Sequence, residues 1–194
     1  MSDRDDDPSA AAALQAEVDR LRQQLAEAER RIGELEMHAD VDPMLEILNR
    51  RGFERALARS LAYVERYGAA AALMFIDLDG YKAVNDRHGH AAGDTLLRMV
   101  AAELTGNVRA SDVVGRLGGD EFGVLLWNVG APHAVAKARD LERTIEQAGV
   151  VFGAERLSVG ASAGIVAMSP DVGVAQLIEA ADRAMYARKR ERRG

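Results

Sequence analysis

The sequence predicts an α+β domain, with a central sheet flanked by helices on both faces and a separate helix in front of it. Three observations predict this class. Helical and strand-like patterns alternate from residue 42 onward. The chain has 194 residues, of which 48% are hydrophobic, enough to bury the core of one ordinary domain but not of a second large one. Before residue 42, by contrast, aliphatic residues recur every seven positions.

The N-terminal part is expected to divide into a disordered acidic tail, residues 1–9, and a parallel dimeric coiled coil, residues 10–41. The sevenfold pattern has two series, with Val18, Leu25 and Ile32 at a positions and Leu14, Leu21, Ala28 and Leu35 at d positions. Glu17 faces Arg22, and Arg31 faces Glu36, across such a dimer, and each pair is weakly attractive. The alternative is a helix that packs the same stripe on its own domain.

Residues 42–194 are expected to form one domain whose elements follow in order. A helix at about 51–67 precedes an apolar run, 70–77, that ends abruptly in carboxylates and is typical of a buried strand. After a helix near 93–106, two short apolar runs at about 112–116 and 121–127 flank a Gly-Gly pair, as in a β-hairpin. A helix near 132–148 follows. The small and β-branched residues of 157–166 suit a central strand, and 174–189 is a closing amphipathic helix.

The hairpin turn carries the most informative residues. Gly118 and Gly119 allow positive φ and remove side-chain bulk, so a flat ligand could lie against the backbone beside Asp120 and Glu121. A bare hairpin does not need these acids. Taken alone, however, the pattern also fits a surface hairpin with solvated carboxylates.

A second group of acids ends the predicted strand 70–77. Asp77 and Asp79 alternate with Leu78, and a glycine opens the loop that follows. Hard divalent cations take oxygen ligands, so Asp77, the Leu78 carbonyl and Asp120 form a candidate Mg²⁺ site that would handle a nucleoside triphosphate. The alternative is that the acids cap a short helix that begins near Tyr81.

Four separated motifs make residues 42–193 resemble the GGDEF domain, the catalytic module of diguanylate cyclases. They are Gly118–Phe122, Asp77–Asp86, His88–Asp94 and Ala181–Tyr186. The resemblance implies the palm-like fold of nucleotidyl cyclases, in which a mostly antiparallel sheet brings Asp77 beside the hairpin. It also implies that two GTP molecules are condensed into cyclic di-GMP, with release of two pyrophosphates and with two Mg²⁺, or Mn²⁺, per active site.

The resemblance assigns catalytic and base-binding roles. Asp77, Asp120 and the Leu78 carbonyl would bind metal, and Glu121 would either assist deprotonation of the 3′-hydroxyl or hold the second metal. The guanine base would be contacted by Asn85, Asp94 and His90, with room made by Gly118 and Gly119. Asp94 favours guanine over adenine and hence the symmetric product. Without the motif, Asn85 and Asp94 could equally be helix caps, and His88 with His90 lacks the further ligands that zinc needs.

Phosphate contacts are expected from the amides around Gly80 and Tyr81 and from Lys82, Lys189 and Arg193. Lys189 and Arg193 keep the four-residue spacing of the family, although Arg192 replaces the usual glycine.

An inhibitory product site is expected around Arg109 and Asp112. The two residues form an RxxD motif that begins nine residues before Gly118, where the family has its inhibitory motif. Arg139 or Arg143, on the next helix, is the candidate second contact for cyclic di-GMP.

One segment departs from the family pattern. Where relatives usually have Leu-Thr-Gly-Leu, this chain has Met44-Leu45-Glu46-Ile47. Without the threonine and glycine, Leu45 and Glu46 could continue the preceding helix instead of making a bend. The link between coil and catalysis is therefore an open question, while the catalytic residues are unaffected.

Composition limits the partners. A net charge of −6 argues against nucleic acid, and the lack of cysteine excludes disulfides and thiol catalysis. The N-terminal residues lack an apolar signal core, and no run reaches transmembrane length, so we expect no membrane insertion and a cytoplasmic location. Expected partners are GTP, cyclic di-GMP, a second copy through the coil, and a regulator that the sequence does not identify. The rival functions are a catalytically idle receptor for cyclic di-GMP and a coiled-coil scaffold.

Overall fold

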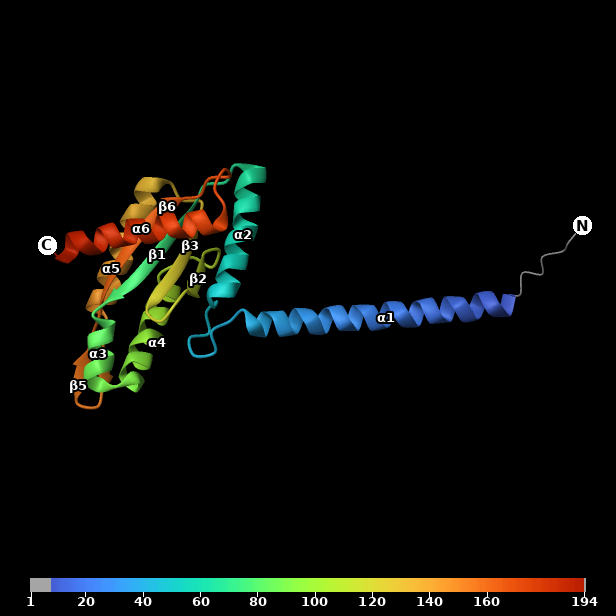
Figure 1. Ribbon diagram of the computed structural model, residues 1–194, viewed down its shortest axis with the longest axis horizontal. Helices are drawn as coiled ribbons and strands as arrows, with labels where there is room; N and C mark the ends of the chain where they lie inside the picture. Colours follow the sequence, from blue (N-terminus) through green and yellow to red (C-terminus); the bar gives the residue numbers. More distant parts are fainter. Residues whose placement is uncertain (1–7, 194) are drawn as a thin grey trace, which may run out of the picture. The chain divides into compact units, whose positions relative to one another are not determined.

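The computed structural model describes residues 8–193, without the side chains at positions 8–14, 28–29, 32–38 and 193 (Figure 1). Contacts divide the chain into two compact units, Met1–Ala39 and Asp40–Gly194. In the described part of the chain, no helix is both long and apolar enough to cross a lipid bilayer.

The first unit contains a single long helix, α1 (Pro8–Ala39). Within one chain, Arg20 pairs with Glu17 and Arg31 with Glu27, contacts that stabilise the helix locally. Leu21 and Leu25 are 51% and 60% exposed. Residues 1–7 of the predicted tail 1–9 lie outside the described residues, but Pro8 and Ser9 begin α1, so their assignment to a disordered tail is wrong. The side chains of Leu14, Ala28, Ile32 and Leu35 also lie outside the described residues, and the coiled coil stays a prediction.

The second unit is built on a four-stranded sheet in the order β2-β3-β1-β6, antiparallel throughout. The strands are β1 (Ala71–Asp79), β2 (Val113–Arg116), β3 (Glu121–Trp127) and β6 (Gly160–Ala167). The predicted α+β class with a mostly antiparallel sheet is therefore confirmed.

One predicted strand, 157–166, is wrong as a single element. Leu157 ends β5 (Glu155–Leu157), which pairs with β4 (Val150–Phe152) in a separate hairpin, and β6 starts three residues later. The sequence gives a weak signal for this hairpin because each strand has only three residues. Gly153, at φ 63°, makes the turn between them.

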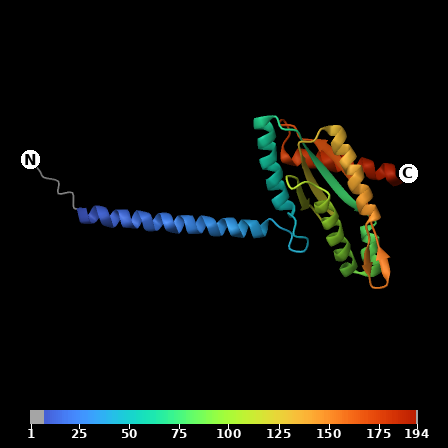
Figure 2. The same cartoon turned by 180° about the vertical axis from the view of Figure 1, so that it is seen from behind.

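The alternation of side chains along β1 separates two cores, one on each face of the sheet (Figures 1 and 2). Met74 and Ile76 pack with α4 (His90–Gly106) and α5 (Ala131–Gln147). Leu73 and Phe75 pack with α2 (Arg50–Tyr67) and α6 (Val174–Arg193). The short helix α3 (Tyr81–His88) directly follows β1.

The segment between α1 and α2 forms a turn, so the expectation that Leu45 and Glu46 continue the helix is wrong. Oδ1 of Asp42 accepts hydrogen bonds from the amides of Met44 (2.9 Å) and Leu45 (3.0 Å). Leu45 and Ile47 are buried in the core on the α4 side, and Glu46 adopts φ 57°. Burial of the two aliphatic side chains and the bonds of Asp42 outweigh the local preference for helix.

Candidate active site

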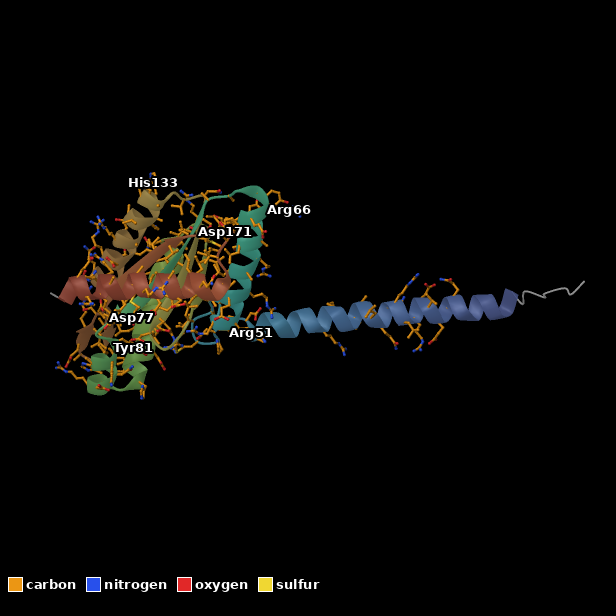
Figure 3. All side chains as sticks on the ribbon, turned by 45° about the horizontal axis from the view of Figure 1, so that its top comes forward. Arg51, Arg66, Asp77, Tyr81, His133 and Asp171 are labelled. Atoms are coloured by element: carbon orange, nitrogen blue, oxygen red, sulfur yellow. The ribbon has the colours of Figure 1, made fainter. Side chains whose placement is uncertain are left out.

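Asp77 lies directly opposite Glu121 in the β1–β3 pairing. One residue further along, the amide of Leu78 donates a hydrogen bond to the carbonyl of Asp120 (3.2 Å). Amide and carbonyl of one strand residue point to the same side, so the Leu78 carbonyl also faces the hairpin. The predicted adjacency of the strand end and the hairpin is confirmed. Figure 3 shows that Asp77 and Tyr81 lie at the same end of the sheet.

The hairpin glycines serve close approach rather than unusual dihedral angles. Neither Gly118 nor Gly119 has positive φ, so that part of the expectation is wrong. A Cβ at Gly118 would collide with the carboxylate of Glu121, whereas one at Gly119 would meet open space. A side chain at position 118 would therefore displace the carboxylate of Glu121, and Gly119 leaves the turn uncovered.

Two arginines that the sequence did not single out hold the turn. Nε of Arg50 donates to the Leu117 carbonyl (2.6 Å), and its guanidinium is 3.5 Å from Glu121. Arg116 donates to the carbonyls of Gly118 (3.0 Å) and Gly119 (2.8 Å). The only sequence signal was their position, in Asn49-Arg50-Arg51 and two residues before the glycines.

Arg116 also binds Asp42 at 3.1 Å. Burial, the largest single influence, would raise the pKa of Asp42. The hydrogen bond from Arg116 and those from the amides of Met44 and Leu45 together outweigh it and hold the pKa below its usual value. Asp42 is therefore a carboxylate that connects the turn after α1 to the hairpin.

The hairpin acids are held in an environment that opposes their charge. Burial, and then the charge of Asp77, raise the pKa of Asp120. Burial also raises the pKa of Glu121; Arg50 opposes this effect, while Asp77, Asp120 and Asp182 add to it. A bound cation would relieve the crowding of these acids.

Lys189 is the side chain that compensates this charge. It forms an ion pair with Asp77 and lies 3.6 Å from Asp79. Ser162 donates to the other oxygen of Asp79 (2.8 Å), while Oδ1 is buried with no hydrogen-bond partner among the described residues. Lys189 thus contacts carboxylates here, and its phosphate contact stays a prediction. The side chain of Arg193 lies outside the described residues.

The helix-capping alternatives are wrong for the acids of this region. Gly80 precedes α3 at φ 85° and Gly89 precedes α4, and neither helix start has a side-chain cap. Asp79 is therefore not a cap of α3, and Asp94 is not a cap of α4.

Asn85 faces the start of α4. Its Oδ1 is buried without a hydrogen-bond partner among the described residues. A Cβ at Gly93 would collide with that oxygen and come within 2.9 Å of the Tyr81 hydroxyl. The side-chain amide of Asn85 therefore lies against Gly93, the residue before Asp94. His90 and Lys82 are exposed nearby in sequence, on α4 and α3.

The donor set fits Mg²⁺ bound jointly with substrate phosphates. Within residues 8–193, no three His, Cys, Asp or Glu side chains converge on a metal position, so a site made of protein side chains alone is not formed. Mg²⁺ usually takes one or two carboxylates and completes its shell with water and phosphate. Asp77 and Asp120 could supply those carboxylates. Burial, and then the charge of Asp77, raise the pKa of Asp120, as expected where two acids lie close together.

The predicted inhibitory residues do not all meet. Asp112 accepts hydrogen bonds from the amides of Arg109 (2.9 Å) and Trp127 (3.0 Å), so it has a structural role. Arg109 and Asp112 line one hollow, while Arg139 lines another beside Glu142 on α5. Arg143 pairs with Asp140. Within one chain, the described residues do not place Arg109 and Arg139 in a shared cavity.

Comparison with known proteins gives a family match. Residues 39–194 match the family described as "Diguanylate cyclase, GGDEF domain". The chain is 38% identical over 173 residues to "Probable diguanylate cyclase DgcE" of Escherichia coli, covering 89% of this chain and 16% of DgcE. It is 38% identical over 163 residues to diguanylate cyclase TpbB of Pseudomonas aeruginosa, covering 79% and 36% of the two chains. The chain therefore spans much less than two thirds of either relative.

Solved structures extend the match to the fold. A sensory box/GGDEF family protein from Caulobacter crescentus is 38% identical, with a TM-score of 0.71, and the match covers 78% of this chain and 99% of that one. The coiled coil and GGDEF domain of DgcB from Caulobacter crescentus, in complex with c-di-GMP, is 26% identical, with a TM-score of 0.74 and coverage of 95% and 94%. SiaD from Pseudomonas aeruginosa, a diguanylate cyclase in complex with its activator SiaC, is 27% identical, with a TM-score of 0.75 and coverage of 97% and 75%.

Proposed function

Because this chain belongs to the GGDEF domain family of diguanylate cyclases, we propose that it condenses two GTP molecules into cyclic di-GMP and two pyrophosphates. The observation that carries the proposal is the meeting of Asp77, Asp120 and Glu121 at one end of the sheet, where burial and mutual repulsion raise the pKa of the two hairpin acids. Such perturbed carboxylates are typical of a site that works with cations and protons.

In the proposed reaction, the 3′-oxygen of each GTP forms a bond to the α-phosphorus of the other, and at each phosphorus the bond to the pyrophosphate oxygen breaks, so that the ring closes and two pyrophosphates leave. Glu121 is our candidate to accept the hydroxyl proton, since its raised pKa brings it closer to the pH at which it works. Mg²⁺, held by Asp77, Asp120 and the Leu78 carbonyl, would supply charge neutralisation at the phosphates. Arg50 and Arg116 would hold the turn in place during the reaction.

Guanine recognition is proposed for Asn85 and Asp94. The unpaired Oδ1 of Asn85 can accept a hydrogen bond from the N–H edge of guanine, and a carboxylate at position 94 offers a second acceptor. An unsatisfied buried acceptor costs free energy, so a base that supplies the missing donor gains affinity over one that does not. Lys82, Lys189 and the amides that follow Asp79 are the proposed phosphate contacts.

The reaction needs two domains that face each other, because each would carry one GTP. We propose that a parallel coiled coil of α1 joins two copies and raises the effective concentration of one domain near the other. The matched structure of DgcB also contains a coiled coil before its GGDEF domain. An activator protein is a candidate further partner, since SiaD was solved with one. We place the reaction in the cytoplasm, where GTP and Mg²⁺ are abundant.

The decisive experiment is incubation of the full chain with GTP and Mg²⁺, followed by chromatographic separation of nucleotides. We expect cyclic di-GMP from the unmodified chain and at least about a hundredfold less from Asp120→Asn, which keeps the shape of the side chain but removes a metal-binding charge. Asp171→Asn, an exposed acid on the loop before α6 (Figure 3), is the matched control and should retain activity. No product from the unmodified chain would refute the proposal, and tight product binding without turnover would favour the idle receptor.

Product inhibition is proposed for the hollow lined by Arg109 and Asp112. Arg109 is exposed and its guanidinium is available for a phosphate or a guanine edge. Arg109→Ala should weaken the inhibition constant of cyclic di-GMP by about tenfold or more without changing the initial rate. Unchanged inhibition in a progress-curve assay would reject this part of the proposal.

A further inference from the structure

A cavity of about 520 Å³ opens between α2 and the ends of β2 and β3. It shares no lining residue with the candidate active site. Its polar and aromatic lining consists of Arg59, Ser60, Tyr63, Ser111, Trp127 and Asn128. A volume of this size lies within the usual range of small-molecule sites, which is about 300–1,000 Å³.

The cavity exists because β2 is shorter than its neighbour. Val113 at the start of β2 pairs with Leu125, so Trp127 extends past the last cross-strand partner that β2 provides. The amide of Trp127 is satisfied by the carboxylate of Asp112 instead of by a strand carbonyl (3.0 Å). The indole therefore lies at a sheet edge with no residue of β2 opposite it.

Aromatic rings form one wall. Tyr63 and Trp127 meet edge to face, with centroids 5.4 Å apart and planes at 89°. Tyr63 is nevertheless 50% exposed, and Trp127 is half-buried. Two perpendicular and partly exposed rings form a corner. A flat molecule in this corner can stack on the face of one ring and meet the other ring edge to face.

The charge of the lining is positive. Arg59 is the one charged residue that lines the cavity, and it makes no ion pair with any side chain that the structure describes. This contrasts with a chain whose net charge is −6. Ser111 and Asn128 are exposed at the same cavity and can donate hydrogen bonds. An unpaired guanidinium beside an aromatic corner is complementary to an anion on a flat ring.

We propose that this pocket is a binding site for a planar aromatic molecule that carries an anionic group. Its ring would lie in the corner of Tyr63 and Trp127, and its anion would pair with Arg59. The proposal does not depend on the cyclase activity proposed above.

A ligand there would also reach the turn that contains Arg109. One carboxylate, that of Asp112, holds both the amide of Trp127 and the amide of Arg109. Any shift of Trp127 on binding therefore acts on the Arg109 turn through a single side chain. The site is thus placed to change how that turn presents its arginine.

The test uses the fact that Trp127 is the single tryptophan of the chain. Full-length protein that carries fluorotryptophan gives one fluorine resonance from the indole, and naphthalene sulfonate serves as a planar anionic probe. We expect saturable binding with a Kd below about 1 mM and a shift of that resonance. Naphthalene methanol, which is uncharged, should bind at least about tenfold more weakly.

Two variants and a control define the site. Arg59→Gln should weaken the sulfonate about tenfold and leave the uncharged probe unchanged. Ser111→Phe, a substitution at an exposed turn residue, should abolish the shift by filling the cavity. Arg66→Gln is the matched control, since Arg66 is on the same helix and stacks on Tyr67 but does not line the cavity. Circular dichroism should report the same fold for all three.

The outcomes separate clearly. Loss of affinity for the sulfonate in Arg59→Gln, with full affinity in Arg66→Gln, supports the site. An unshifted indole resonance in the unmodified protein overturns it. So does equal weakening by Arg59→Gln and Arg66→Gln, which would mean that the probe responds to general charge.

Discussion

Asp120 is held in the hairpin against its own electrostatic preference. Burial and the charge of Asp77 raise its pKa in the folded chain. A group with a raised folded pKa contributes stability below its unfolded pKa, and this contribution is lost as the pH rises through the folded pKa. At neutral pH, the charge of Asp120 therefore destabilises the fold.

Removing that charge should stabilise the protein while it abolishes activity. We expect Asp120→Asn to raise Tm by about 2 °C at pH 7 without metal, with the gain shrinking towards pH 4 as Asp120 becomes protonated in the unmodified chain. Mg²⁺ should raise the Tm of the unmodified chain more than that of the variant. Thermal unfolding at both pH values measures this, with Asp171→Asn as control, and a lower Tm for Asp120→Asn at pH 7 would contradict the argument.

Glu46 is a residue at which the chain is locally strained. It adopts φ 57°, a region that is unfavourable for a residue with a Cβ. Glu46→Gly should raise the free energy of unfolding by about 0.5–1 kcal/mol, since the relief of strain exceeds the added freedom of the unfolded chain. Urea unfolding measures the change. Glu46→Ala removes the same charge but keeps the Cβ, so a similar gain in that variant would disprove strain as the cause.

Single residues also show what sequence patterns can predict. Asp77 and the hairpin acids were expected together because the resemblance implies that the strand ending at Asp77 lies beside the hairpin, and β1 does pair with β3 there. Arg50 and Arg116 were missed because their partners are backbone carbonyls of the hairpin turn, and the carbonyl of Leu117 lies 67 residues from Arg50. No local pattern distinguishes such an arginine from a solvated one.

At the scale of elements, Glu142 anchors α6. Its side chain is 3% exposed and accepts a hydrogen bond from the amide of Ala163, on the free edge of β6 (2.9 Å). It also forms ion pairs with Arg188 (2.9 Å) and Arg192 (3.4 Å) of α6. Glu142 also raises the pKa of Arg188, chiefly through their hydrogen bond. Lys189 lies between the two arginines in sequence. The predicted helix 174–189 was too short, because these contacts across the fold hold the additional turn.

Glu142→Ala should therefore destabilise the domain by about 2–3 kcal/mol, because it leaves an edge amide and partly buried guanidinium groups without their acceptor. It should also raise the KM for GTP more than it lowers kcat, since Lys189 loses its support. Urea unfolding and steady-state kinetics measure the two effects. Glu179→Ala removes an exposed partner of Arg183 on the same helix and should cost less than about 1 kcal/mol; equal costs would argue against an anchor at Glu142.

Elements with a clear local signal were predicted well, whereas the three-residue strands β4 and β5 were missed. The hairpin of β2 and β3 was expected within about one residue of its bounds. The sequence suggested that Leu45 and Glu46 could continue the preceding helix, because the threonine and glycine of the family pattern are missing. The chain bends there because Asp42 pairs with Arg116, 74 residues away, and because Leu45 and Ile47 are buried in the core.

At the scale of the whole molecule, two leucines of the predicted seam on α1 are exposed in the single chain. Leu21 and Leu25 are more than half exposed, which suits a helix that pairs with a second copy. The sequence pattern predicts this pairing but a single chain does not test it.

Leu25→Glu should weaken the dimer at least about a hundredfold, since it would bury two like charges in the seam. Cyclase activity per chain should then fall at low protein concentration and recover at high concentration. Light scattering and rates over a dilution series measure this. Gln23→Glu adds the same charge at an exposed position outside both heptad series and should leave the dimer intact. If the activity per chain of Leu25→Glu did not depend on protein concentration, catalysis would not need the coiled coil.

The alternation of β1 between two cores also determines where the chain tolerates a change of length. Met74 and Ile76 face α4 and α5, while the neighbouring odd-numbered residues, Asp77 included, face the side of α6. An insertion of one residue in the middle of β1 would move the side chains that follow it, or those that precede it, to the opposite face of the sheet. Either the carboxylates at the end of β1 or the aliphatic residues before them would then face the wrong helices. The hairpin of β4 and β5 pairs only with itself in the sheets. Natural and engineered length variation should therefore accumulate at its turn and be excluded from β1.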